Sequence, residues 1–85
     1  MIFIIELDSG RLSLEFPCSA TDRVMDALSR EYGNISRKAF AAAYDIKVSG
    51  ERFVMDDEWG NCCIISTSSR GDGMLRRVLQ IVAPD

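Results

Sequence analysis

The fold of this chain is decided near its start, by residues 3–16, FIIELDSGRLSLEF. Apolar and polar residues alternate on both sides of Ser9-Gly10, as in two strands joined by a tight turn. A two-residue turn there would place Leu7 opposite Leu12. The sequence therefore predicts a β-hairpin whose apolar side chains share one face: Phe3, Ile5, Leu7, Leu12, Leu14 and Phe16.

Two helices are expected after this hairpin. The first begins near Ser19, a capping residue type, and ends at Gly33. Its apolar residues repeat at helical spacing: Val24, Ala27, Leu28 and Tyr32. The second is expected over residues 36–44, because the run of alanines at 41–43 favours helix.

The second half of the chain predicts another hairpin and a last helix. Its expected segments are a connector or short strand at 46–49, a strand at 52–57, a turn at 59–61, a strand at 62–65, a turn at 70–73 and a helix at 72–82. Asp72 is the expected cap of this helix, and Pro84 is expected to end it. The register of the hairpin over 51–68 stays open, because turns of two or three residues give different pairings.

These segments give the order β-β-α-α-β-β-α. Paired strands separated by helices favour a two-layer α+β fold, with an antiparallel sheet of about four strands and the helices on one face. No linker or repeat divides the sequence, so one domain over residues 1–85 is expected.

The composition argues against catalysis and for a binding role. The 85 residues include no histidine, so the commonest general base near neutral pH is missing. No nucleotide, cofactor or nucleophile motif is present, and no enzyme activity or cofactor is expected. The formal charge of −3 disfavours non-specific binding to nucleic acid and permits binding to a basic protein or groove.

Three cysteines, without a C-x-x-C pair, predict reduced thiols in a cytoplasmic protein. No long apolar run or signal peptide is visible, and no membrane association is expected. Cys62 and Cys63 are expected in a core strand. Cys18 precedes a helix, whose free amides can lower a thiol pKa, so a thiol-transfer role for Cys18 is a further alternative.

Residues 55–63, MDDEWGNCC, contain the most informative candidate site. The only tryptophan, Trp59, follows three consecutive carboxylates, and tryptophan is frequent among the anchors of protein interfaces. The predicted partner-binding residues are Asp56, Asp57, Glu58, Trp59 and Asn61. Neighbouring side chains of a strand point to opposite faces, so no metal site is expected there. The alternative is a solvated strand that resists aggregation through its charges.

Residues 28–37, LSREYGNISR, resemble the turn of a helix-turn-helix DNA-binding motif. Leu28 and Tyr32 occupy its apolar positions and Gly33 its turn, although Asn34 interrupts the usual pattern. The resemblance implies a winged-helix regulator that uses residues 28–44, with the following hairpin as its wing. The DNA-contacting residues would be Arg37, Lys38 and Lys47.

The preferred interpretation is a small acidic protein that binds another protein. Chains of this size and charge include stoichiometric inhibitors such as immunity proteins, antitoxins and anti-CRISPR proteins, which occlude a basic surface of their target. A homodimer through the second face of the sheet or an edge strand is also open, with Ile2, Ile4 and Cys62 or Cys63 as candidates. Arg70, Arg76 and Arg77 either form a second patch or neutralise nearby carboxylates.

Overall fold

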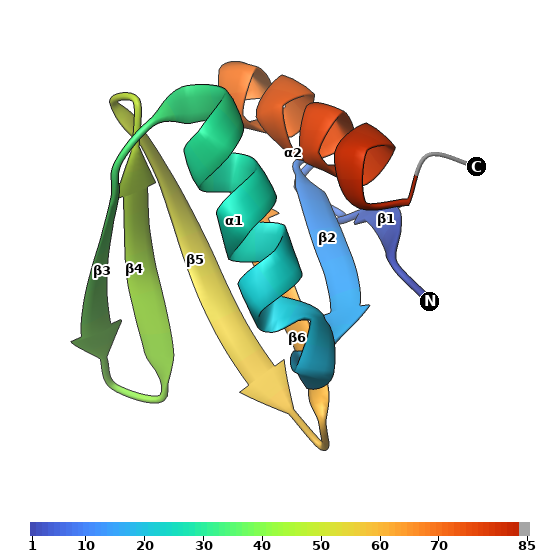
Figure 1. Cartoon of the computed structure of the whole chain (residues 1–85). Coiled ribbons are helices and arrows are strands. Elements are labelled where there is room, and N and C mark those ends of the chain that lie inside the picture. Colours follow the sequence, from blue (N-terminus) through green and yellow to red (C-terminus); the bar gives the residue numbers. More distant parts are fainter. Residues whose placement is uncertain (84–85) are drawn as a thin grey trace.

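A computed structural model describes residues 1–83 of the chain (Figure 1). The elements in chain order are β1 (Phe3–Glu6), β2 (Leu12–Pro17), the short 3-10 helix η1 (Cys18–Ala20), α1 (Thr21–Tyr32), β3 (Ile35–Phe40), β4 (Ala43–Val48), β5 (Glu51–Glu58), β6 (Asn61–Ser66) and α2 (Ser69–Val82).

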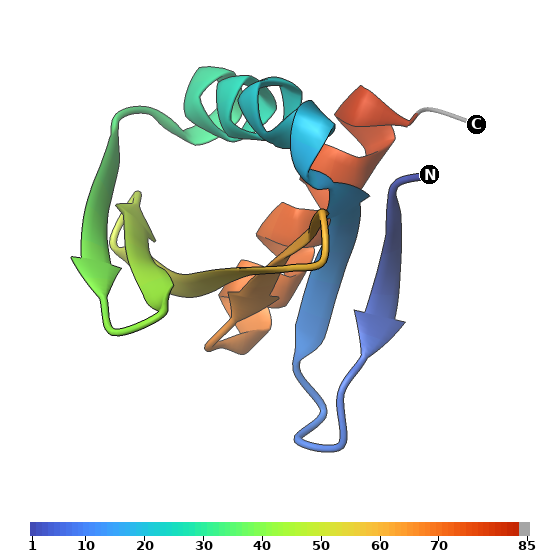
Figure 2. The same cartoon turned by 90° about the horizontal axis from the view of Figure 1, so that it is seen from below.

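The strands form one antiparallel six-stranded sheet in the order β1-β2-β6-β5-β4-β3. The sheet curves strongly, and both helices lie within its concave side (Figure 2). The predicted α+β class with helices on one face is therefore confirmed. The expected strand number of about four and the expected element order are wrong.

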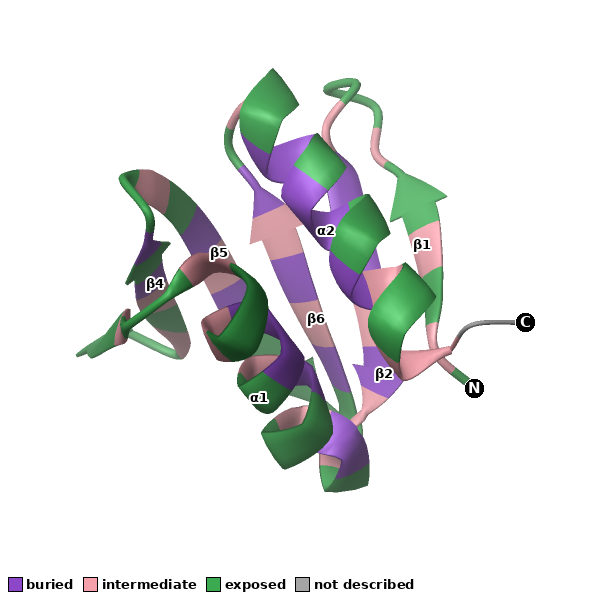
Figure 3. Cartoon of the chain, turned by 45° about the horizontal axis from the view of Figure 1, so that its top comes forward, coloured by how far each residue is buried: buried purple, intermediate pink, exposed green. Residues whose placement is uncertain are grey.

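The core lies between the helices and the central strands. Alternate residues of β6 and one side of α2 are buried (Figure 3). Leu14, Phe53, Ile64 and Leu75 are completely buried and come from β2, β5, β6 and α2. Burying one side chain of this size stabilises a fold by roughly 1.5–3 kcal/mol, so these residues contribute much of the stability of the molecule.

The first hairpin forms, but one residue out of the predicted register. Its loop has three residues, because the Leu7 N–H donates to the Arg11 carbonyl (2.9 Å) and Gly10 closes the turn with a φ of 87°. A shift of one residue moves every side chain of a strand to the other face. Phe3 and Ile5 are consequently 43% and 41% exposed.

The other residues of this hairpin follow from the same shift. Ile4 of β1 and Ile2, just before that strand, are half-buried, so these two dimer candidates are packed against the core. Leu12, Leu14 and Phe16 of β2 are buried, as predicted.

The helix predicted over 36–44 is absent, and β3 and β4 occupy that region. Ile35 pairs with Val48, and Ile46 pairs with Phe53 of β5, so these apolar side chains meet across strands. A lone helix of this length is marginal in water, and the cross-strand packing outweighs the helix propensity of the alanines. The segment predicted at 46–49 as a connector or short strand is the second half of β4 and its turn, so the short-strand alternative is confirmed.

The two remaining helices are confirmed, with different starts. Ser19 lies in η1, and the residue at the N-cap of α1 is Ala20, which forms no side-chain capping bond; the helix ends at Gly33 as predicted. The turn predicted at 70–73 is the first turn of α2, and Ser68, not Asp72, caps that helix by accepting from the Gly71 N–H (2.9 Å). The predicted terminator Pro84 lies outside the described residues. Within residues 1–83, neither helix has the length and apolarity to cross a bilayer.

Candidate functional site at the β5–β6 hairpin tip

The candidate site lies at the tip of the hairpin formed by β5 and β6. Glu58 pairs with Asn61, so Trp59 and Gly60 alone form the turn. Both have positive φ angles, 56° and 81°, as a type I′ turn requires. The sequence left this register open, and the structure assigns the two-residue turn.

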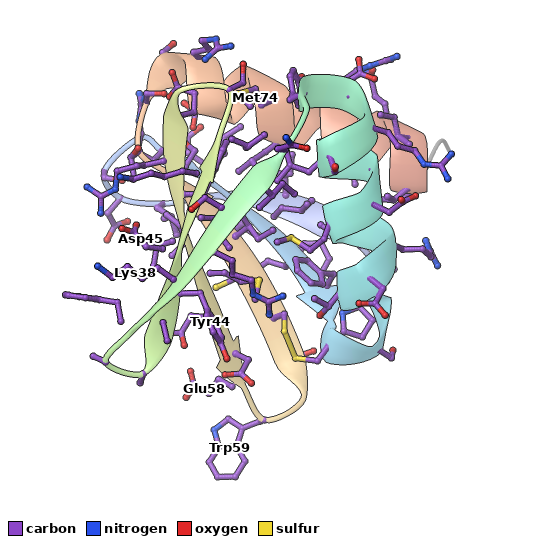
Figure 4. The ribbon with its side chains drawn as sticks, turned by 60° about the vertical axis from the view of Figure 1, so that its left-hand side comes forward. Lys38, Tyr44, Asp45, Glu58, Trp59 and Met74 are labelled. Carbon is purple, nitrogen blue, oxygen red and sulfur yellow. A yellow bond between two sulfur atoms is a disulfide. The ribbon has the colours of Figure 1, made fainter. Side chains whose placement is uncertain are left out.

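Trp59 projects from this tip into solvent, and 93% of its surface is exposed (Figure 4). Its backbone occupies the left-handed region, which is unfavourable for a bulky residue. No described side chain covers the indole enough to bury it. Trp59 therefore contributes little to the core of its own chain.

The predicted carboxylates surround the tip but divide between the two faces of the sheet. Asp57 pairs with the buried Cys62, so it lies on the helix side. Asp56 pairs with Cys63 and lies, like Glu58, on the opposite side, which we term the open face. All three acidic residues are exposed.

A fourth carboxylate, Glu15 of β2, joins the group from a distant part of the sequence. Cys63 pairs with Glu15 on one side and with Asp56 on the other, so the three side chains share the open face. A depression of 260 Å³ lies among Glu15, the carboxylates of residues 56–58 and Trp59. The alternation in residues 12–16 places Glu15 on the polar face of its strand, but only the pairing of β2 with β6 brings it to the site. We term Glu15, Asp56, Asp57, Glu58 and Trp59 the acidic tip.

The acidic tip is electrostatically uncompensated. Within residues 1–83 none of its carboxylates forms an ion pair, whereas other acidic residues do: Asp72 with Arg11, Asp26 with Arg30, Asp45 with Arg52, Glu51 with Arg70 and Glu31 with Arg77. Glu15 accepts a hydrogen bond from the Ser13 hydroxyl (2.5 Å). No group of His, Cys, Asp and Glu in the described part of the chain is arranged to hold a metal ion.

Two of the three cysteines are joined, which corrects the prediction of reduced thiols. Cys18 and Cys62 form a disulfide with their Cα atoms 5.1 Å apart, so Cys18 is not a free thiol. Cys63, the free cysteine, lies half-buried on the open face. Burial raises the pKa of its thiol, and the nearby carboxylates of Glu15 and Asp56 raise it further, which outweighs weaker hydrogen bonds. Cys63 is therefore a poor nucleophile at neutral pH.

The alternative DNA-contacting residues lie on a hairpin and not on a recognition helix. Lys38 and Lys47 point to the open face of β3 and β4, while Arg37 points to the helix side and stacks on Tyr44, 4.8 Å from the ring centre. The helix-turn-helix interpretation of residues 28–44 is therefore wrong. DNA binding through these cations stays a prediction, and it would have to use a β-hairpin.

Arg70 and Arg77 of α2 form hydrogen bonds and ion pairs with neighbouring elements of the fold. Arg70 donates to the Ser49 carbonyl (2.7 Å) and pairs with Glu51 (3.2 Å), while Arg77 pairs with Glu31 (3.0 Å). Hydrogen bonds from Ser68 and Arg70 lower the pKa of Glu51. Arg70 and Arg77 are thus already bound to residues of their own chain, and they neutralise the carboxylates of Glu51 and Glu31.

Comparisons of this chain with protein-family models, curated proteins and solved structures found no significant match.

Proposed function

We propose that this chain is a non-catalytic binding module whose acidic tip occludes a basic surface of a target protein. It would act as a stoichiometric inhibitor of the kind represented by immunity proteins, antitoxins and anti-CRISPR proteins. The target would be recognised by arginine or lysine side chains around a small apolar recess.

The exposed Trp59 carries this proposal. A residue that is 93% exposed gains little from the hydrophobic effect in the free chain. At a positive φ of 56° it also imposes backbone strain where Asn, Asp or Gly would be favourable. Trp59 therefore lowers the stability of the free protein, and burial of its indole against a partner would offset that cost.

The carboxylates supply the complementary part of the mechanism. Unpaired charges of one sign raise association rates with an oppositely charged partner and orient the encounter. In the bound state the indole would be the buried anchor, with the surrounding carboxylates excluding water and pairing with cations of the target. The raised pKa of the Cys63 thiol also supports a binding role over nucleophilic chemistry at this site.

Affinity capture of the full chain from its source cells tests the proposal. One protein recovered near equal stoichiometry is the expected result, and its affinity can then be measured by calorimetry. Trp59→Ala should weaken binding by about tenfold or more, and by more than any single change of Asp56, Asp57 or Glu58 to the corresponding amide. Arg76→Ala, a change of an exposed residue on α2, is the matched control. Wild-type affinity of a folded Trp59→Ala variant would refute the assigned site.

The same capture addresses two subordinate expectations. Nucleic acid recovered without a protein partner would favour the DNA-binding alternative. The expected cytoplasmic location requires that the Cys18–Cys62 bond persist or be dispensable in a reducing compartment. Thiol trapping in intact cells before lysis would report which state the chain has there.

A further inference from the structure

A second apolar turn lies at the same end of the molecule as the acidic tip. Ala41 and Ala42 connect β3 to β4, and Figure 1 shows this turn and the β5–β6 turn at the same end of the sheet. Phe40, the last residue of β3, is 72% exposed. Ala41 has a positive φ of 52°, a conformation that favours glycine. Like Trp59, these residues present apolar surface to solvent and contribute little to the core of the free chain.

The β3–β4 turn borders a depression of 280 Å³ on the open face. Phe40 pairs with Ala43, and both residues line this depression. Val54 and Asp56 line it from β5. Asp56 also lines the depression of the acidic tip, so the two depressions are adjacent. Together they form one strip across the open face from Phe40 to Trp59, which we term the open-face strip.

The uncompensated charge of the open-face strip is negative. Asp45 and Arg52 line it but pair with each other (3.0 Å). The carboxylates of the acidic tip form no ion pair within residues 1–83. Lys38 and Lys47 lie on the same face of the sheet, but neither lines the two depressions. The strip thus combines apolar side chains with unpaired carboxylates, which complements a partner that is both apolar and basic.

The open-face strip runs across the strands, and this direction determines the conformation of its occupant. β4, β5 and β6 each pair with a strand on both sides, so their backbone groups are already hydrogen-bonded. A segment that lies on this face must satisfy its own backbone groups, as an α-helix does. Phe40 and Trp59 are separated by the width of two to three strands, roughly 10–14 Å. Two to three turns of helix cover about 11–16 Å, which matches this separation.

We propose that the open-face strip binds a basic amphipathic α-helix of the target protein. Apolar side chains two to three turns apart on that helix would contact Phe40 and Trp59, and an arginine or lysine between them would pair with Asp56. The helix would form one wall of the recess that receives Trp59. This inference rests on the proposed function of the acidic tip, and it adds Phe40 as a second anchor and a helical conformation for the binding segment of the target.

A peptide-display selection against the immobilised full chain tests this inference. The probe is a library of random peptides of about eighteen residues, because shorter helices are marginal in water. The expected result is enrichment of peptides whose apolar residues repeat at helical spacing, with arginine or lysine between them. The tightest peptide is then labelled, and its affinity is measured by fluorescence anisotropy. Phe40→Ala and Trp59→Ala should each weaken binding by about tenfold, and Asp56→Asn by about threefold.

The controls separate the new anchor from the acidic tip. Ile81→Ala, which truncates an exposed apolar residue of α2, should bind like wild type. Phe40→Leu, which keeps an apolar side chain, should stay within about threefold of wild type. Wild-type affinity of a folded Phe40→Ala variant would overturn the inference, and the acidic tip would stand if Trp59→Ala still weakened binding. No enrichment over the bare surface, or enriched peptides that lack cations or helical spacing, would also overturn it. Capture of the target from source cells tests the acidic tip independently of this selection.

Discussion

At the scale of single residues, Trp59 holds a backbone conformation that its side chain disfavours. Replacing it with asparagine would create Asn-Gly, the preferred pair for a type I′ turn. We expect Trp59→Asn to raise the free energy of unfolding by about 0.5–1 kcal/mol, because the strain at φ 56° is relieved and little buried contact is lost. Urea denaturation measures the change. The same variant should bind the captured partner more weakly, and a less stable variant would show that the indole supports its own fold.

Asp72 is a second residue whose role can be isolated. Its carboxylate is buried and accepts hydrogen bonds from the Leu12 N–H (2.9 Å) and the Ser66 hydroxyl, with Arg11 at 3.3 Å. It therefore ties the first turn of α2 to the neighbouring strands. We expect Asp72→Asn to lower the free energy of unfolding by about 2 kcal/mol at pH 7, because charged hydrogen bonds are lost. Ser69→Ala, a change of an exposed residue in the same turn, is the matched control.

The pH dependence of stability provides an independent check on Asp72. Burial alone would raise its pKa, but hydrogen bonds from Ser66 and Leu12, together with Arg11, hold the pKa below its ordinary value. The folded state then binds fewer protons than the unfolded state. The stabilisation is complete above the unfolded pKa of about 3.9 and is lost as the pH falls through the lower folded pKa. Wild-type stability should fall more steeply than that of Asp72→Asn below about pH 4.

At the scale of elements, the Cys18–Cys62 disulfide joins η1, at the start of α1, to β6 across 44 residues of sequence. Such a link restricts the unfolded chain and typically stabilises a fold by about 2–4 kcal/mol. We expect a double change of Cys18 and Cys62 to serine to lose that amount in guanidinium denaturation. Cys63→Ser should change stability little. Alkylation in denaturant should modify one cysteine before reduction and three after it, and three before reduction would contradict the bond.

Elements whose side-chain pattern agreed with their local propensity could be predicted from the sequence. The stripe of Val24, Ala27 and Leu28 predicted α1, and alternation predicted both strands of the first hairpin. The alanines at 41–43 led to the wrong prediction of a helix over residues 36–44, because alanine favours helix locally. Ile46 and Val48, which follow them, are buried in the sheet instead. The one-residue shift of β1 depended on a loop of three residues, which alternation alone does not reveal.

The candidate site, too, could be predicted only where its residues are neighbours in the sequence. Trp59 and its adjacent carboxylates were visible as neighbours in sequence. Glu15 was not, because it reaches them only through the pairing of β2 with β6. The disulfide was not predicted for a related reason. Cys18 and Cys62 become neighbours only because the residues that follow β2 lie beside the tip of the β5–β6 hairpin.

At the scale of the whole molecule, the sheet is unevenly supported. β2, β6 and β5 carry completely buried side chains beneath the helices, whereas all of β3 except its first residue is exposed. Local opening requires less free energy where fewer apolar contacts are broken. β3 thus has little support from the core.

Hydrogen exchange can measure this gradient directly. We expect amides of β2 and β6 to exchange only through global unfolding, and amides of β3 to exchange through a local opening of lower free energy. The Cys18–Cys62 bond should hold the β6 side of the sheet together even when β3 and β4 separate from it. Exchange followed by NMR over increasing urea distinguishes the two classes by their slopes. Equal protection of β3 and β6 would mean that the sheet opens as one unit.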